Sequence, residues 1–331
     1  MIRITRDDIP QISQEFDAFL SEYLTDGRSK KKKKTLLDKW IKTASKKSDA
    51  ENRHYALMLT FYKNERKNIA AINSLNDLRH INARFYKHFR NDISDWKKAS
   101  KDEKPNKAFG LFSKKMSDIY SDFISYSGDK VNLKNKAIHN PGEWLAKRLT
   151  IRTCPYCNRH YTFTVEKNDK RNSIRPQFDH FLPKSRYPLT ALCLYNLIPS
   201  CPDCNKVKLE RTLTIHPYED SFDDKGLEFE ANFLDFSVRI KNGDTHPNVQ
   251  QLALNELYSQ HYDLVEDIYK KAIGYTSDYY KSLIDNFSGL GMTEADLEKL
   301  IWGNYISITD DLSRPFSKFT RDLCRQLGII L

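Results

Sequence analysis

Two pairs of cysteines constrain the fold of this chain more than any other feature of its sequence. Cys154 and Cys157 enclose Pro-Tyr, and Cys201 and Cys204 enclose Pro-Asp. With two residues between its cysteines, each pair can turn both sulfurs to one side of the chain, so four thiolates can surround one tetrahedral zinc ion. We therefore predict a structural zinc that closes the 43-residue segment between the two pairs at its base.

A disulfide framework is the alternative use of these cysteines. The chain is long and rich in lysine, and its first residues, Met-Ile-Arg-Ile-Thr-Arg, lack the apolar segment of a secretory leader. No stretch approaches the ~18 apolar residues of a membrane span. These features indicate a cytoplasmic, reducing compartment, where such pairs more often bind metal. Cys193 and Cys324 stand apart from the pairs and are expected to be small buried hydrophobes.

Between the pairs, the hydrophobic pattern changes from helical to alternating. Residues 161–166 and 174–180 both alternate, and the polar run 168–173 between them has turn composition. The pattern predicts a hairpin of two strands. A helix is predicted to begin near Cys201, which gives the order strand, strand, helix.

Asp179-His180, Asn196 and Asn205 stand within this segment, with eight residues between the two asparagines. The set resembles the HNH endonucleases. Their ββα-metal motif has an Asp-His pair at the end of the second strand, an Asn in the connecting loop and a His or Asn on the helix. The motif covers about a sixth of the chain.

The resemblance implies a role for each of these residues. His180 would be the general base, and Asp179 and Asn205 would be ligands of a catalytic cation. Asn196 would fix the connecting loop. The four cysteines would hold the structural zinc that one large branch of the family contains.

The chemistry of these side chains agrees with those roles. A neutral histidine, with an ordinary pKa near ~6.5, can take a proton from water at cellular pH. Asp179 and Asn205 offer only oxygen ligands, which suit a hard cation such as Mg²⁺ or Mn²⁺. Many relatives have His at the Asn205 position, which would favour softer ions, so the Asn here favours magnesium.

Four basic residues flank the predicted site and are candidates for holding phosphates. Each of them can equally be a solvated surface charge. They are Lys184, Arg186, Lys206 and Lys208. His160 and His216 are not assigned to the zinc, because four cysteines already complete a tetrahedral site.

Length and charge indicate three regions. The predicted fold class is α+β and mostly helical, with a basic helical domain at 1–147, the zinc-containing HNH nuclease module at 148–218, and an acidic, mainly helical region at 219–331. Residues 1–150 hold 32 Lys+Arg against 19 Asp+Glu, and residues 212–331 hold 11 against 20. We expect a polyanion to lie across the first two regions.

Local signals predict several elements within these regions. Ser48 to Glu51 has the pattern of a capping box, and Asn140-Pro141 resembles a helix start. Residues 227–230 and 236–240 alternate like two short strands, followed by a turn at 241–244. The five lysines at 30–34 are a solvated loop or a DNA contact. The basic and aromatic residues at 84–90 fit either a helix core or a base-stacking surface, and helix periodicity favours the core.

The sequence therefore predicts a metal-dependent HNH endonuclease that hydrolyses DNA, although RNA remains open as a substrate. The whole resembles the zinc-stapled HNH effectors of bacterial anti-phage defence, including the HNH subunit of Septu-type systems, which acts beside an SMC/ABC-like ATPase. Two alternatives remain: a non-catalytic, zinc-stabilised nucleic-acid-binding module, and a zinc scaffold for protein assembly. No membrane partner is expected.

Overall fold

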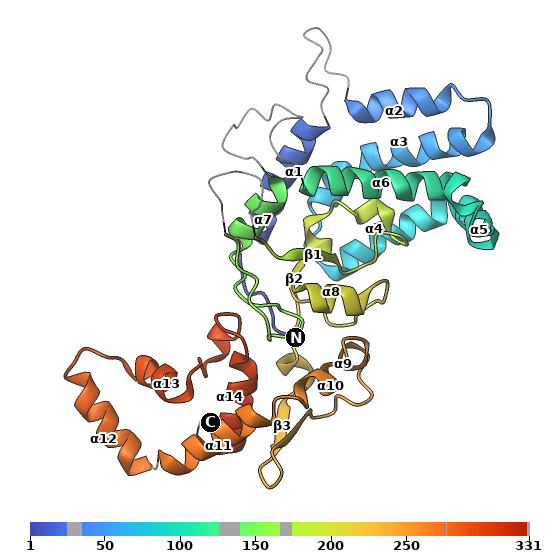
Figure 1. Ribbon diagram of the computed structural model, residues 1–331. Helices are drawn as coiled ribbons and strands as arrows, with labels where there is room; N and C mark the ends of the chain where they lie inside the picture. The colour runs from blue at the N-terminus through green and yellow to red at the C-terminus, as the bar shows by residue number, and fades with distance from the viewer. Residues whose placement is uncertain (25–34, 126–139, 166–173, 276, 330–331) are drawn as a thin grey trace. The chain divides into compact units, whose positions relative to one another are not determined.

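The computed structural model describes residues 1–24, 35–125, 140–165, 174–275 and 277–329 (Figure 1). The lysine run at 30–34 and the predicted turn at 168–173 lie outside these residues. The chain divides into two compact units. The His180 unit contains Arg6–Thr150 and Thr164–Ile198, and the cysteine unit contains Met1–Thr5, Ile151–Phe163 and Pro199–Leu331.

The segment predicted to form one module, 148–218, contributes residues to both units. The three-region division stays a prediction.

Seven α-helices are described in the His180 unit. They are α1 (Ile9–Tyr23), α2 (Leu36–Ser45), α3 (Ala50–Ala70), α4 (Leu75–His88), α5 (Arg90–Lys98), α6 (Ala108–Ile124) and α7 (Pro141–Leu149). Helix α3 packs against α2 and α6 (Figure 1). Short 3₁₀ turns lie at Lys104–Asn106, Pro188–Thr190 and Leu194–Asn196.

Aromatic side chains fill much of the core of this unit. Phe85 and Phe112 stack with their ring centroids 5.3 Å apart, and both are fully buried. Phe89 is also buried, whereas Arg84 and Lys87 on the same helical stretch are exposed. Helix periodicity favoured the aromatic residues Tyr86 and Phe89 as core, and of these Phe89 is buried and Tyr86 is half-buried.

Helices begin at both places where the sequence predicted a start, but only one of them has the predicted cap. Asn140 caps α7 by accepting a hydrogen bond from the Glu143 amide at 3.0 Å, as predicted. The capping box at 48–51 is wrong: Asp49 is the N-cap residue of α3, and its side chain accepts from the Asn52 amide at 2.9 Å. The Glu51 carboxylate accepts instead from the Ala108 amide at the start of α6, 2.7 Å away, so it is not free to close the box.

The predicted hairpin is wrong over most of its length. In its place, strand β1 (Gln177–His180) is hydrogen bonded to β2 (Leu197–Ser200), whose first two residues belong to the His180 unit. Within the described part of the predicted hairpin, its two strands meet at one bridge, between Val165 and Ile174. Tyr161 pairs with Thr153 in the cysteine unit, because the Cys154–Cys157 turn folds its two flanking segments against each other.

The cysteine unit contains one two-stranded antiparallel sheet, β3 (Phe229–Asn232) and β4 (Ser237–Ile240), with Phe229 opposite Ile240. Its described helices are α8 (Pro202–Lys208), α9 (Pro247–Gln251), α10 (Leu254–Tyr258), α11 (Tyr262–Gly274), α12 (Ser277–Ser288), α13 (Glu294–Trp302) and α14 (Ser317–Gln326). A 3₁₀ turn lies at Asp223–Lys225 and another at Ile308–Asp310. The two strands and the helix near Cys201 confirm their predictions. Helix α14 packs against β3.

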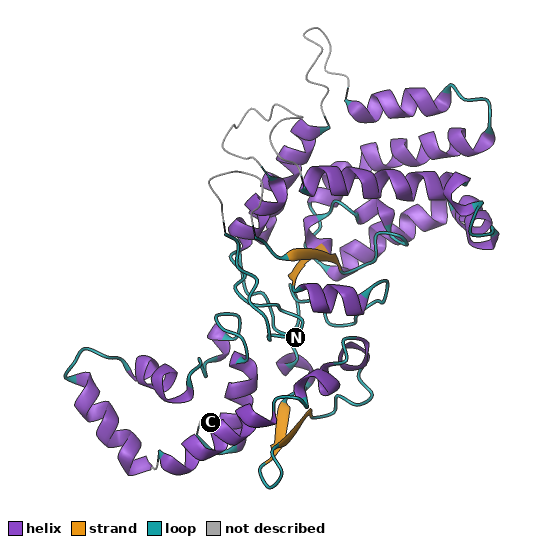
Figure 2. Ribbon diagram, viewed as in Figure 1, coloured by secondary structure: helices purple, strands orange, loops and turns teal. Residues whose placement is uncertain are grey.

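Helix predominates in the described chain, and the strands form small two-stranded sheets (Figure 2). The predicted α+β class with a mostly helical content is thus confirmed. Among the described helices, none is both long enough and apolar enough to cross a membrane.

Candidate functional site

The four paired cysteines form one cluster in the cysteine unit. Their sulfur atoms all lie within 4.8 Å of one another, and each side chain is at most 3% exposed. The Cys157 and Cys201 sulfurs are 3.8 Å apart, far beyond the ~2.05 Å of a disulfide bond, and all four thiols are free. The predicted gathering of the two pairs is confirmed, and the cluster could hold a structural zinc.

In each pair, a backbone amide donates to one of the sulfurs. The Arg159 amide donates to Cys157 Sγ, and the Cys204 amide donates to Cys201 Sγ, each over 3.4 Å. Cys201 is also the N-cap residue of α8. Such donors stabilise negative charge on sulfur, which favours the thiolate form that binds a metal.

Crowding of the sulfurs has an electrostatic consequence. Hydrogen bonds with the other three thiols, together with burial, raise the pKa of Cys204 well above its usual range. Four thiolates in so small a buried space repel one another unless a cation neutralises them. A bound zinc would supply that charge, so the donor set fits the ion in both geometry and chemistry.

Asn158 is a structural residue that the sequence reasoning missed. Its backbone has φ +54°, a left-handed conformation that closes the turn after Cys157. Its side-chain amide donates to the Asp311 carbonyl at 2.7 Å and accepts from the Lys318 amide at 3.2 Å. An Asn directly after a Cys-x-x-Cys pair was the available signal, because Asn tolerates this conformation better than most residues.

Asp311 and Lys318, the two residues that Asn158 contacts, belong to a cluster of buried charged side chains in the cysteine unit. Arg321 on α14 is 1% exposed and lies 3.0 Å from carboxylate oxygens of both Asp223 and Asp311. Lys318 lies 2.7 Å from Asp223 and 2.9 Å from Asp322. Burial raises the pKa of Asp311 to about 7, although the nearby Arg321 charge opposes this shift. Sequence patterns offered no signal for this cluster.

The histidines near the cysteine pairs have other partners. His160 Nε2 lies 3.1 Å from a carboxylate oxygen of Asp203. His216 is fully buried, and its Nδ1 accepts from the Tyr218 amide at 3.3 Å. Among the described residues, neither joins the group of possible metal ligands.

The second candidate centre is His180, the last residue of β1 in the His180 unit. His180 Nε2 lies 2.9 Å from the Ala191 carbonyl oxygen. A carbonyl can only accept a hydrogen bond, so Nε2 carries a hydrogen, and in the neutral ring Nδ1 is the nitrogen with the lone pair. The ring also makes an edge contact with Tyr120 of α6, with centroids 4.5 Å apart.

Asn196 fastens the loop that follows His180. Its Oδ1 accepts from the Leu182 amide at 2.7 Å, and its Nδ2 donates to the Leu182 and Thr190 carbonyls at 3.1 and 3.2 Å. The Phe181 amide donates to the Asn196 carbonyl at 2.9 Å. Asn196 is completely buried, so these contacts hold both ends of the loop without competition from water.

Tyr120 is a further residue of this centre that sequence reasoning missed. Its hydroxyl donates to the Phe178 carbonyl at 3.2 Å. Burial raises the pKa of Tyr120 well above its usual range, and the nearby Asp179 charge adds to the effect. The phenol therefore stays neutral and supports the His180 ring. Tyr120 lies on α6, far from the motif in sequence, so the motif itself does not indicate it.

The four basic candidates differ in accessibility. Arg186 and Lys206 are exposed, while Lys208 is fully buried. Lys184 is half-buried, with its Nζ 4.8 Å from the centroid of the Tyr120 ring, and burial lowers its pKa. Arg186 and Lys206 are thus the two candidates most open to a phosphate.

The structure brings together Asn196 and the segment that carries Asp179 and His180, and it separately brings together the four cysteines. Asp179 is 3% exposed and His180 is 8% exposed. Asn205 lies on α8 in the cysteine unit, while Asp179 belongs to the His180 unit. The shared cation of Asp179 and Asn205 therefore stays a prediction.

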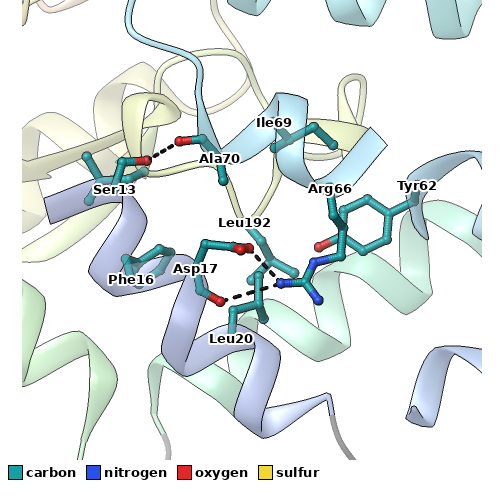
Figure 3. A pocket seen from close by; sticks show the side chains of 10 residues that line it. Ser13, Phe16, Asp17, Leu20, Tyr62, Arg66, Ile69, Ala70 and Leu192 are labelled. Atoms are coloured by element: carbon teal, nitrogen blue, oxygen red, sulfur yellow. Dashed lines mark hydrogen bonds and ion pairs between the residues drawn. The ribbon is translucent and has the colours of Figure 1, made fainter. Parts of the chain in front are cut away.

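A small cavity in the His180 unit lies among α1, α3 and the loop residue Leu192 (Figure 3). Its volume is about 10 Å³, enough for one water molecule. Arg66 borders it and donates to an Asp17 carboxylate oxygen at 2.6 Å and to the Ser21 hydroxyl at 2.7 Å. The buried Arg66 Nε has no protein partner, so a bound water would complete its hydrogen bonding. The cavity is too small for a substrate.

Comparison of the chain with protein-family models, with curated proteins and with solved structures found no match. The described residues form a buried four-cysteine cluster that could bind zinc and, in the other unit, a histidine that contacts the backbone of a loop held by Asn196.

Proposed function

We propose that this protein is a metal-dependent endonuclease of the HNH type that hydrolyses phosphodiester bonds in DNA, with His180 as general base. The observation that carries the proposal is the contact between His180 Nε2 and the Ala191 carbonyl. It orients the imidazole, and in a neutral ring it puts the hydrogen on Nε2, so that Nδ1 would be the proposed proton acceptor. Asp179 precedes this histidine directly, as the motif requires.

In the proposed reaction, His180 Nδ1 removes a proton from the attacking water. The Asp179 carboxylate and the Asn205 amide oxygen would hold a divalent cation, Mg²⁺ or Mn²⁺, which would stabilise the charge on the phosphate and on the leaving oxygen. Asn196 keeps the loop after His180 in place. The resemblance implies products with a 5′-phosphate and a 3′-hydroxyl.

The buried cysteine cluster also supports the proposal, because it lies next to the helix that carries Asn205. A structural zinc at Cys154, Cys157, Cys201 and Cys204 would hold the start of α8, because Cys201 is the N-cap residue of this helix. Asn205 lies on α8, one residue after Cys204. The zinc would therefore fix the backbone that presents the second proposed ligand.

We also propose a biological role, which rests on the resemblance alone. HNH effectors that combine this motif with a zinc staple serve in anti-phage defence, and the Septu-type subunit acts beside an SMC/ABC-like ATPase. We propose a comparable effector role in the cytoplasm for this chain. Cleavage assays with and without a co-expressed ATPase from the neighbouring gene test this part of the proposal.

The catalytic proposal is tested with supercoiled plasmid in Mg²⁺ or Mn²⁺. We expect nicking or linearisation by the unmodified chain and a loss of about 10²- to 10⁴-fold in rate for His180→Ala. His54→Ala is a matched control, since His54 is an exposed histidine of the same unit. Omitting the cation is preferable to chelation, because a chelator would also attack a zinc at the cysteine cluster.

A non-catalytic, zinc-stabilised binding module is the alternative function. It predicts salt-dependent DNA binding that survives His180→Ala and disappears when the cysteines are changed. Equal cleavage by His180→Ala and the unmodified chain would contradict the catalytic proposal. Intact plasmid with both proteins, also after co-expression with the partner, would favour the binding module.

A further inference from the structure

Two aromatic side chains near the cysteine pairs point into solvent. Tyr161 is 49% exposed and Phe163 is 42% exposed. Their rings are stacked, with centroids 4.4 Å apart and an angle of 19° between the planes. Both belong to the cysteine unit. Exposed large apolar groups that gather at one place are informative, because burial would normally be favourable for each of them.

Local structure explains why these two rings share a face. The Thr162 amide donates to the Arg152 carbonyl at 2.8 Å, and the Cys154 amide donates to the His160 carbonyl at 2.9 Å. The segment after the first cysteine pair is thus paired with the segment before it. In such an extended segment alternate side chains point to opposite faces, so residues 161 and 163 lie on one face.

Two threonines of the paired segments are buried. Thr153 is fully buried and Thr162 is 4% exposed. Their hydroxyls donate to the Leu312 and Ile151 carbonyls at 3.1 and 2.8 Å. Because both hydroxyls are satisfied, these polar contacts hold the paired segments in place while the two rings stay exposed.

A positive charge accompanies the rings. The guanidinium carbon of Arg152, an exposed side chain, lies 5.6 Å from the centroid of the Phe163 ring. The segment that carries the rings, 151–163, contains Arg152 and Arg159 and no Asp or Glu, so the charge beside the rings is positive. Aromatic faces beside arginine are the combination that stacks on bases while attracting the phosphate backbone.

Charge complementarity decides the class of occupant. A basic surface attracts a polyanion, and the two ring faces need flat partners that are not already stacked on neighbours. Bases inside a duplex are stacked on both sides, whereas unpaired bases are available. Single-stranded nucleic acid meets both requirements.

We infer that Arg152, Tyr161 and Phe163 form a platform on which unpaired bases stack, so that the substrate is nucleic acid with a single-stranded segment. The inference rests on the proposed nuclease function and adds its substrate class. Tyr161 and Phe163 contribute ring faces, and Arg152 contributes the charge that holds the backbone nearby.

The test measures binding of a fluorescein-labelled dT20 oligonucleotide by anisotropy, without added divalent cation and in the His180→Ala background, so that no cleavage occurs. We expect the double change Tyr161→Ala with Phe163→Ala to weaken dT20 binding about 5-fold or more. Binding of a 20-base-pair duplex should change by less than 2-fold. Tyr279→Ala removes an aromatic side chain that is 51% exposed on α12 and should leave dT20 binding unchanged.

Two further measurements separate stacking from a folding defect. Zinc content of the double variant should match that of the unmodified chain, since neither ring is a ligand. In Phe163→Trp, dT20 should quench tryptophan fluorescence more than it does in the unmodified chain, and the duplex should not.

Equal dT20 affinity of the double variant and its parent would overturn the platform, as would equal weakening of duplex binding. Neither result touches the nuclease proposal, which depends on cleavage of plasmid by the unmodified chain and its loss in His180→Ala. Conversely, selective loss of dT20 binding would support the platform even if plasmid stayed intact.

Discussion

His180 donates its Nε2 hydrogen to the carbonyl oxygen of Ala191, 2.9 Å away. The acceptor lies in the loop that Asn196 fastens through Leu182 and Thr190. Orientation of the histidine therefore depends on the shape of this loop. Asn196 thus acts on the histidine indirectly, through the backbone of the loop.

Asn196→Ala should cost about 2–4 kcal/mol in the free energy of unfolding of the His180 unit. The reason is that three buried backbone groups, on Leu182 and Thr190, lose their partner. Urea denaturation measures the loss. Asn73→Ala, at an exposed position, should change the free energy by less than about 0.5 kcal/mol. A similar small change for both variants would mean that the loop does not need Asn196.

Cys204→Ser should lower bound zinc from about one ion per chain and reduce the unfolding temperature, because a tetrahedral site loses one of four ligands. Elemental analysis of the purified protein measures the zinc. Cys193→Ala is the matched control: Cys193 is also buried, but it lies outside the cluster. Full zinc in Cys204→Ser, or equal loss in Cys193→Ala, would contradict the assignment.

Asn158 makes it possible to separate backbone conformation from side-chain contacts. Asn158→Gly keeps the left-handed turn and loses the contacts to Asp311 and Lys318, which should cost about 1–3 kcal/mol. Asn158→Ala loses the same contacts and adds about 1 kcal/mol of backbone strain. Denaturation should therefore rank the native chain above Gly and Gly above Ala. Equal stability of the Gly and Ala variants would show that the backbone relaxes.

Asp311 predicts a pH dependence. Its pKa is raised from 3.8 to about 7 in the folded chain, so the folded state binds its proton more tightly than the unfolded state does. The stability contributed by this group is fully present below about pH 4 and is lost as pH rises through about 7.

Asp311→Asn removes this titration, because an amide does not ionise. Between pH 5 and pH 8 its stability should improve relative to the unmodified chain by at least about 1 kcal/mol. Denaturation curves of both proteins at both pH values give the difference between their free energies of unfolding. Contributions from other titrating groups cancel in this difference, because both proteins contain them. A difference that does not vary with pH would show that the buried carboxylate keeps its ordinary pKa.

Features that depend on neighbouring residues were predicted well. The Cys-x-x-Cys spacing brings two sulfurs together within each pair, and the structure gathers both pairs into one cluster. The start of α7 at Asn140 and the strands β3 and β4 follow from local capping and alternation. In each case the interacting groups lie within a few residues or across a short turn.

Pairings between distant segments were predicted poorly. Residues 161–166 alternate like a strand, but alternation does not identify a partner, and β1 pairs with β2 instead. Burial of Lys208 and the contact of Tyr120 with His180 likewise join residues that local patterns do not relate.

From the order of its residues alone, this chain specifies which side chains can bind metal or move a proton, because those properties belong to the side chains and to short spacings. Only the tertiary structure decides which nitrogen of His180 holds the hydrogen, which contacts Asn158 and Asn196 make, and that Tyr161 and Phe163 face solvent. These outcomes depend on backbone groups brought together from distant parts of the chain, whose meeting is determined by the packing of the whole unit.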